Sequence, residues 1–377
     1  MLQFLLTLPL ALCAILYAGV NESGGEFANP TNQSVGEYSG ALINGEKFGG
    51  YQFINQSHIQ YFINAGVNVF RITLLLERMC PLEYGLGSKF NNTYFDEYQQ
   101  AVNTVTNGGA YALIDPHNYM RYNNASMQPV SGSVIGNTSD PTAATTQEFA
   151  EFWAEMAYRF KYNPNVIFGI MNEPHDMPTQ LVFDNDQAAI HAIRGVGASQ
   201  LILVPGNGYT GAHSWTNSTG SGLLPNSQVL SAIQDPADNY AFDMHQYFDV
   251  DFSGTHNACI SADTCVSTLQ AATSWLRSNN QKAFLSEFGG GSNQNCFDCL
   301  NNTLQYLSQN GEWIGWAYWA AGPLWGNYFL SVEPDEGPEF NTTWPMVLKP
   351  NVAAASLRSF GISSAYIYGE EPASYFT

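Results

Sequence analysis

The sequence predicts a single α/β domain in which eight parallel strands close into a (β/α)8 barrel, the architecture called a TIM barrel. Short apolar runs rich in β-formers alternate along the chain with segments of helical periodicity, as in parallel sheets. Eight such units favour a closed barrel over an open sheet. An open doubly wound sheet is the structural alternative, but no glycine-rich phosphate loop follows the first strand.

The apolar runs give the strand positions, and the amphipathic stretches between them give the helices. The expected strands are Leu16–Val20, Val67–Thr73, Tyr111–Asp115, Val166–Met171, Leu201–Pro205, Tyr240–Met244, Ala283–Glu287 and Trp313–Trp319. The clearest expected helices are Gln147–Tyr162, Gln187–Gly197, Leu269–Asn279 and Leu300–Asn310. Between the fifth and sixth strands only the short stretch Gln228–Ile233 is available for a helix.

The barrel is expected to span residues 15–350, with a short segment before it and a tail after it. Residues 1–14 are almost wholly apolar, but a bilayer span needs roughly 20 residues. We therefore interpret them as a signal peptide, the alternative being an extended hydrophobic segment. Residues 351–377 are expected to form an Ala/Ser-rich helix and a Tyr-rich tail of unknown role.

The charge balance excludes two classes of partner. The chain of 377 residues has 32 acidic and 12 basic side chains, a formal net charge of -20. Such a surface repels nucleic acid and anionic lipid heads, so we expect neither nucleic-acid nor membrane binding. A soluble protein acting on a neutral or cationic substrate is expected, and 21 Tyr and 8 Trp suit a cleft that packs rings against sugars.

Sequons and cysteines also indicate secretion. The Asn-x-Ser/Thr sequons begin at Asn32, Asn55, Asn91, Asn124, Asn137, Asn217, Asn301 and Asn341. Four of the six cysteines form two neighbouring clusters, Cys259 with Cys265 and Cys296 with Cys299, which predicts two disulfides in an oxidising compartment. A zinc site is the alternative, although the first pair is spaced too widely for a usual zinc knuckle. Cys80 is left over as a buried thiol.

Polar side chains gather where the apolar strands end. Because parallel barrel strands all end at one face, and reacting groups collect there, these side chains predict an active site. They are Arg71, His117, Asn118, Asn172, Glu173, His245, Tyr247, Glu287 and Trp319.

Two glutamates in this set suit hydrolysis of a glycosidic bond. The reaction needs a protonated carboxyl for the leaving oxygen and an ionised carboxylate for the anomeric carbon. We assign Glu173 as general acid/base and Glu287 as nucleophile of a retaining enzyme. Arg71 is expected to hold Glu287 ionised and Tyr247 to orient it, while the charge of Glu287 keeps Glu173 protonated. Asn172 is expected to bond a substrate hydroxyl.

This ordered set resembles glycoside hydrolase family 5, over nearly the whole chain. Flanking segments are similar to those of fungal endo-β-1,4-glucanases: residues 20–24, 115–119, 206–212 and 318–323. The resemblance implies a secreted, monomeric enzyme that needs no metal or cofactor and hydrolyses a β-glucan. It implies that Asn172 and His245 support the carboxylates. We expect the substrate contacts to be His117, Asn118, Trp319, Trp215, Tyr209 and Trp325.

The resemblance implies two further points. It implies a disulfide between Cys259 and Cys296, which leaves Cys265 to pair with Cys299. It also places the sequon at Asn21 beside the cleft, so we expect that asparagine to carry no glycan. Tyr209 departs from the family, because a tryptophan is common there, and this changes the expected strength of one outer subsite.

Three other functions stay open. A β-mannanase, or a xyloglucan or mixed-linkage glucan hydrolase, would share the same catalytic set. A metal-dependent barrel hydrolase could use His117 and His245, although no His-x-His pair follows the first strand. A non-catalytic carbohydrate-binding barrel is disfavoured by the presence of Glu173, Glu287 and Arg71 together.

Overall fold

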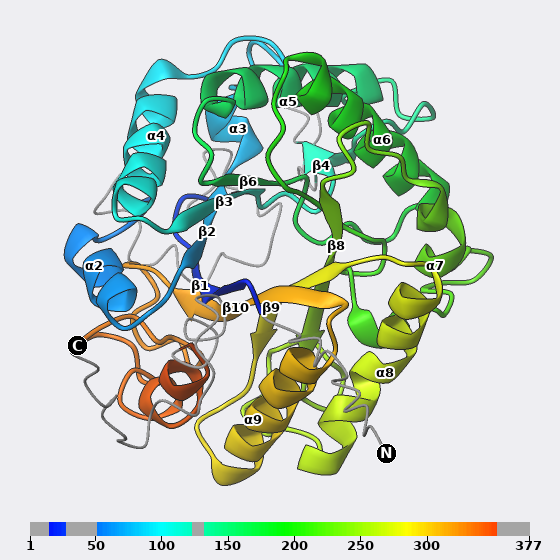
Figure 1. The fold of residues 1–377 in the computed structure, drawn as a ribbon. Coiled ribbons are helices and arrows are strands. Elements are labelled where there is room, and N and C mark those ends of the chain that lie inside the picture. Colours follow the sequence, from blue (N-terminus) through cyan, green and yellow to red (C-terminus); the bar gives the residue numbers. More distant parts are fainter. Residues whose placement is uncertain (1–14, 28–50, 123–131, 353–377) are drawn as a thin grey trace, which may run out of the picture.

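The chain forms a closed barrel of eight parallel strands (Figure 1). The computed structural model describes residues 15–27, 51–122 and 132–352. Around the barrel the strand order is β1-β10-β9-β8-β7-β6-β3-β2, which excludes the open-sheet alternative. The strands are β1 (Tyr17–Glu22), β2 (Val69–Leu74), β3 (Tyr111–Pro116), β6 (Val166–Gly169), β7 (Ile202–Val204), β8 (Tyr240–Tyr247), β9 (Ala283–Gly289) and β10 (Trp313–Ala321). The short strands β4 (Arg121–Tyr122) and β5 (Ser133–Val134) pair as an antiparallel ribbon outside the barrel.

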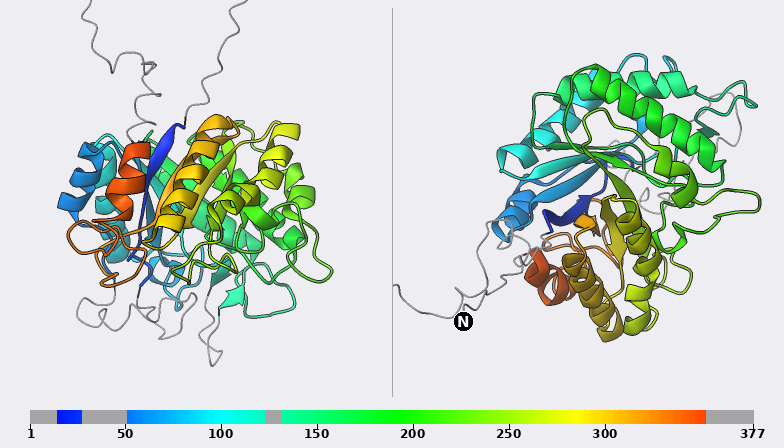
Figure 2. Two further views of the ribbon diagram at one scale, coloured as in Figure 1. Left: turned by 90° about the horizontal axis from the view of Figure 1, so that it is seen from below. Right: turned by 45° about the vertical axis from the view of Figure 1, so that its right-hand side comes forward.

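Helices surround the barrel on its outside (Figure 2). They are α2 (Gln56–Asn64), α3 (Leu76–Met79), α4 (Asn92–Asn107), α5 (Thr146–Phe160), α6 (Thr179–Gly195), α7 (Asn226–Val229), α8 (Ala262–Ser278), α9 (Gln294–Gln309) and a π-helix at Trp344–Leu348. Between β7 and β8 the described chain has only α7 and short 3-10 turns at Ala212–Ser214 and Leu230–Ala232, as the sequence predicted. The start of α5 is fixed by a capping box, in which Thr145 and Glu148 bond each other's backbone N–H groups.

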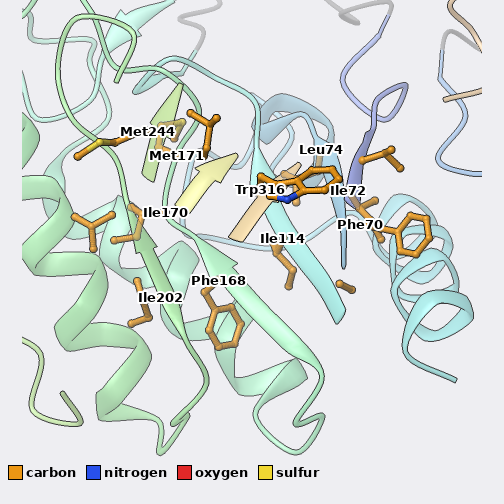
Figure 3. Packing of buried hydrophobic residues seen from close by; sticks show 14 of the residues in the cluster. Phe70, Ile72, Leu74, Ile114, Phe168, Ile170, Met171, Ile202, Met244 and Trp316 are labelled. Carbon is orange, nitrogen blue, oxygen red and sulfur yellow. The ribbon is translucent and has the colours of Figure 1, made fainter. Parts of the chain in front are cut away.

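The two faces of each strand have different surroundings. On β2, Phe70, Ile72 and Leu74 belong to the large core between strands and helices, and Figure 3 shows them with residues of neighbouring strands. Val69 belongs instead to a small apolar cluster with residues of the other strands, which fills the barrel interior. Since side chains alternate along a strand, Arg71 shares the inward face with Val69, two positions further along. The sequence thus places a cation above an apolar plug at the carboxyl end of the barrel.

All eight predicted strands overlap observed ones, and the predicted helices lie within or beside α5, α6, α8 and α9. The helix α6 begins at Thr179, eight residues before the predicted start at Gln187. Residues 1–14 and 353–377 lie outside the described residues, so the signal peptide and the tail stay predictions. No helix in the described ranges is long and apolar enough to cross a membrane.

The cysteine predictions are confirmed. Cys259 pairs with Cys296, and Cys265 pairs with Cys299. The second bond joins α8 to α9. In the chain, β9 lies between these two helices and β10 follows α9. Cys80 is a buried free thiol, and its burial raises its pKa to about 12.

Candidate active site

Arg71 and Glu287 form an ion pair at the carboxyl end of the barrel. Arg71 Nη1 lies 2.5 Å from Glu287 Oε1, and both side chains are almost fully buried. Tyr247 donates its hydroxyl hydrogen to the other oxygen, Glu287 Oε2, at 3.0 Å. Burial raises the pKa of Glu287 above its ordinary value, and the charge and hydrogen bond of Arg71 oppose this rise. The ionised form of Glu287 therefore depends on Arg71.

Arg71 is itself held by three more side chains. Its Nη1 donates to Asn21 Oδ1 at 2.9 Å, and its Nη2 donates to Asn172 Oδ1 at 2.7 Å. Asp115 Oδ2 lies 3.1 Å from Nη2. The guanidinium thus bonds groups from β1, β3, β9 and the segment after β6, a planar arrangement that lysine could not reproduce.

Glu173 follows β6 and faces Glu287 across the barrel mouth. Its Oε1 lies 2.7 Å from His245 Nδ1, and 15% of its side chain is exposed to solvent. The backbone of Glu173 has φ of +43°, a left-handed conformation that non-glycine residues rarely adopt. Strain of this kind concentrates at functional sites, where the surrounding structure imposes it.

A register shift between β8 and β9 brings His245 level with Glu287. Met244 pairs with Leu285, but the next residue, His245, pairs with Glu287, so β9 has one extra residue. His245 Nδ1 is consequently 3.4 Å from Glu287 Oε2 as well as bonded to Glu173. Burial, with the nearby charge of Arg71, lowers the pKa of His245 well below its ordinary value, which favours the neutral imidazole.

His117 and Asn172 complete a second line of hydrogen bonds. His117 Nδ1 lies 2.8 Å from Asp115 Oδ2, and its Nε2 lies 3.1 Å from Asn172 Nδ2. The amide of Asn172 therefore connects His117 to Arg71. The rings of His117 and Trp319 stack with centroids 5.2 Å apart.

The predicted aromatic contacts divide into two groups. Trp319 lies near the end of β10 and contacts Trp325 edge to face, with ring centroids 5.7 Å apart, so these two rings belong to the site. Tyr209 is 50% exposed and stacks on His175, with centroids 4.3 Å apart. Trp215 does not face the cleft: it is fully buried and packs against core aromatics from β8 and α8.

Asn118 also has a structural position instead of the predicted one in the cleft. Its side chain is fully buried, accepts a hydrogen bond from Leu76 N at 2.8 Å and donates to Glu77 Oε2 at 2.8 Å. It therefore ties α3 to the end of β3. We expected Asn118 and Trp215 to contact sugar directly, and this expectation is wrong for both, because both side chains are fully buried.

A cavity of about 690 Å³ opens beside Glu173, on the side of the β6, β7 and β8 loops. Its polar and aromatic walls suit a carbohydrate, whose rings present both hydroxyls and flat apolar faces. The lining residues that bear on function are Glu173, His175, Tyr209, His213, Tyr247 and Phe252.

Two groups of side chains could hold a metal ion by geometry. In the first, ligand atoms of Glu173, His245 and Glu287 lie within 4.8 Å of one another. A cation there would compete with the Arg71 guanidinium, 2.5 Å from Glu287, and like charges repel. The second comprises Asp249, Asp251 and His256 in the loop after β8.

Comparison with known proteins identifies the family. A sequence model described as "Cellulase (glycosyl hydrolase family 5)" matches residues 21–323. The chain belongs to glycosyl hydrolase family 5. Endoglucanase 1 of Robillarda sp. (strain Y-20) is 48% identical over 359 residues, 91% of each chain. A probable endo-beta-1,4-glucanase B of Neosartorya fischeri is 38% identical over 324 residues, 85% of this chain and 87% of the relative.

The fold agrees with solved structures of the family. The structure of XacCel5A in complex with cellopentaose has a TM-score of 0.75 and 34% identity, and the match covers 91% of this chain and 98% of that one. The protein is thus a glycoside hydrolase of family 5 with a TIM barrel.

Two residues of the site were not predicted as such. Asn21 bonds Arg71 and also donates through Nδ2 to Ser286 O at 2.8 Å, so it joins β1 to β9. Asp115 pairs with both Arg71 and His117. Their position along the strands could have identified them. Asn21 and Asp115 lie near the ends of β1 and β3, where the other polar site residues were predicted.

Proposed function

We propose that this chain is a secreted endo-β-1,4-glucanase that cleaves internal bonds of cellulose or related β-glucans with retention of configuration. Glu287 attacks the anomeric carbon while Glu173 gives its proton to the departing glycosidic oxygen, which yields a covalent glycosyl-enzyme. Glu173 then takes a proton from water, which attacks the same carbon and releases Glu287.

The observation that carries this proposal is the spacing of the two carboxylates. One oxygen of Glu173 and one of Glu287 lie within 4.8 Å of each other. Retaining enzymes hold their carboxyls about 5–5.5 Å apart, whereas inverting enzymes leave about 6.5–9.5 Å for a water molecule. The separation supports direct attack by a carboxylate.

The surroundings support different roles for the two residues. Glu287 is buried against a permanent cation and a phenol hydroxyl, which suits an ionised nucleophile. Glu173 faces the cavity beside a neutral histidine, which supplies no positive charge that would favour a carboxylate. That position suits a residue that exchanges protons with substrate and water.

Cellulose-type β-glucan is the substrate that the relatives favour. The relatives at 48% and 38% identity are named endoglucanases, and the solved structure with cellopentaose shows a related protein binding a glucan chain. Exposed Tyr209 on its histidine partner offers a flat surface for a sugar at the cavity wall. The two disulfides and the sequons support secretion, and we propose that the protein acts as a monomer free of membranes.

Product release from carboxymethylcellulose, β-mannan, xyloglucan and laminarin, with wild type beside Glu287→Gln, tests the proposal. We expect release from the cellulose derivative, lost in the variant and unchanged after dialysis against EDTA. Release chiefly from mannan would overturn the substrate, loss on chelation would favour a metal-dependent hydrolase, and no release from any polymer would favour a non-catalytic barrel.

A further inference from the structure

The loop after β8 folds around the carboxylate of Asp249. This side chain is almost fully buried, with 2% of it exposed. Its Oδ1 accepts the N–H of Gly254 at 3.1 Å, and its Oδ2 accepts the N–H groups of Thr255 and His256, each at 3.1 Å. The hydroxyl of Ser253 donates to Oδ2 at 3.1 Å, and His256 Nδ1 lies 3.0 Å from it. One carboxylate thus sets the path of residues 253–256.

That path brings Gly254 against the ring of Tyr247. A β-carbon at Gly254 would lie 2.6 Å from Tyr247 Cδ1, so the loop backbone is in contact with the ring. A β-carbon at Gly289 would lie 3.3 Å from Tyr247 Cε1. Two glycine backbones, one from the loop and one from β9, therefore lie close to the ring. Its hydroxyl reaches Glu287 Oε2 from this position.

We propose that Asp249 is a positioning residue for the nucleophile, which acts through the 253–256 turn and the ring of Tyr247. The inference rests on the proposed function, because it takes Glu287 as the attacking group. Asp249 makes no hydrogen bond to Glu287 and does not itself line the cavity, although it bonds Ser253, which does. It belongs to neither the predicted nor the observed set of groups at the nucleophile. Asp249 acts on Glu287 through the packing of Gly254 on the Tyr247 ring and through the Tyr247 hydroxyl.

The carboxylate is needed in its ionised form. Burial raises the pKa of Asp249, but the hydrogen bonds from His256, Gly254 and Ser253 together lower it by more, so the pKa is below its ordinary value. A carboxylate presents only acceptors to these five groups, whereas an asparagine would turn an NH₂ group toward N–H donors. We therefore expect Asp249→Asn to open the turn and release Tyr247.

A purely structural role would give a different result, and Asp235 supplies the matched control. Asp235 also accepts loop N–H groups, those of Ala237 at 3.1 Å and Asn239 at 2.9 Å, but it precedes β8 at the opposite end of the barrel. Asp235→Asn should lower the melting temperature and leave the rate per folded enzyme unchanged. If Asp249 only stabilised its loop, Asp249→Asn would behave in the same way.

The test is a double-mutant cycle of Asp249→Asn with Tyr247→Phe, beside Asp235→Asn. The readout is the rate at which an activated 2-deoxy-2-fluoro-cellobioside labels Glu287, followed by mass spectrometry. Misplacement of about 1 Å can cost about a hundredfold in rate, so we expect each single variant to lose about tenfold to a hundredfold. Tyr247→Phe should cost little further in the Asp249→Asn background. Wild-type labelling in Asp249→Asn, or the same cost of Tyr247→Phe in both backgrounds, would overturn the inference.

A second variant serves if Asp249→Asn does not fold. Gly254→Ala places a methyl group on the Tyr247 ring and leaves the carboxylate in place, and it should slow labelling to a similar extent. Labelling of folded Gly254→Ala at the wild-type rate would overturn the inference. Wild-type enzyme labelled at a residue other than Glu287 would overturn the proposed nucleophile and this inference together. Labelling at Glu287 with no effect of the loop variants would overturn the inference alone.

Discussion

Replacing Arg71 by methionine removes the positive charge that opposes burial of the ionised Glu287. Breaking a buried ion pair by deleting one partner costs about 3–5 kcal/mol, because the other charge is left without compensation. The cost is relieved when Glu287 takes up a proton, at about 1.36 kcal/mol for each pKa unit. Asp115 keeps His117 as a partner, so we expect the proton to bind Glu287.

A neighbouring arginine lowers the pKa of a carboxyl by about 1–3 units, and its removal should raise the pKa of Glu287 by that amount. Attack requires the ionised form, so activity is lost below this pKa and the acidic limb of kcat/KM moves to higher pH. At a pH below both limbs, the variant should therefore be about ten to a thousand times slower than wild type.

The assay is kcat/KM for an aryl cellobioside between pH 3 and 9, in roughly half-unit steps. Arg194→Met is the matched control, because Arg194 pairs with Asp235 at 2.7 Å on the far side of the barrel. The control should lose stability and keep the wild-type acidic limb. An unshifted limb in Arg71→Met would refute the reasoning that Arg71 keeps Glu287 ionised.

Three further predictions concern the general acid Glu173, the buried carboxyl of Glu339 and the disulfide between Cys265 and Cys299. Glu173→Ala should lose polysaccharide hydrolysis but spare aryl glycosides whose leaving group needs no proton; equal losses in steady-state assays of both substrates would contradict the role. Burial raises the pKa of Glu339 from 4.5 to about 7, so the folded chain holds a proton that the unfolded chain releases in this range. Stability should fall by up to about 3 kcal/mol as pH rises from 4.5 to 7, and thermal melts of Glu339→Gln should show a smaller fall. Replacing Cys265 and Cys299 by serine should cost about 3–4 kcal/mol in urea unfolding for the loop of 34 residues, and an unchanged midpoint would argue against the stabilising role.

The barrel and its two glutamates could be predicted because they depend on local pattern. Each strand is a buried apolar run that ends in polar residues, and the closed topology then brings the ends together. The late predicted start of α6 has a local reason as well. Its first two turns bury polar Asn185 and Asp186, which hide the apolar periodicity of a helix.

The parts that could not be predicted depend on contacts distant in sequence. The pairing of His245 with Glu287 depends on an extra residue in β9, and no local pattern marks this register shift. The sequence also does not distinguish a tryptophan that lines the cleft from a tryptophan that packs in the core. Trp215 follows a barrel strand as a site residue would, yet α8 supplies Trp275 to cover it.

The central claim is that Glu173 and Glu287 act by double displacement, and the configuration of the first product tests it most directly. Proton NMR during hydrolysis of a soluble cello-oligosaccharide distinguishes the two anomers before mutarotation mixes them. Two displacements at one carbon restore the original configuration, so the account predicts that the β-anomer accumulates first. Initial release of the α-anomer would contradict it, because that product requires a single attack by water.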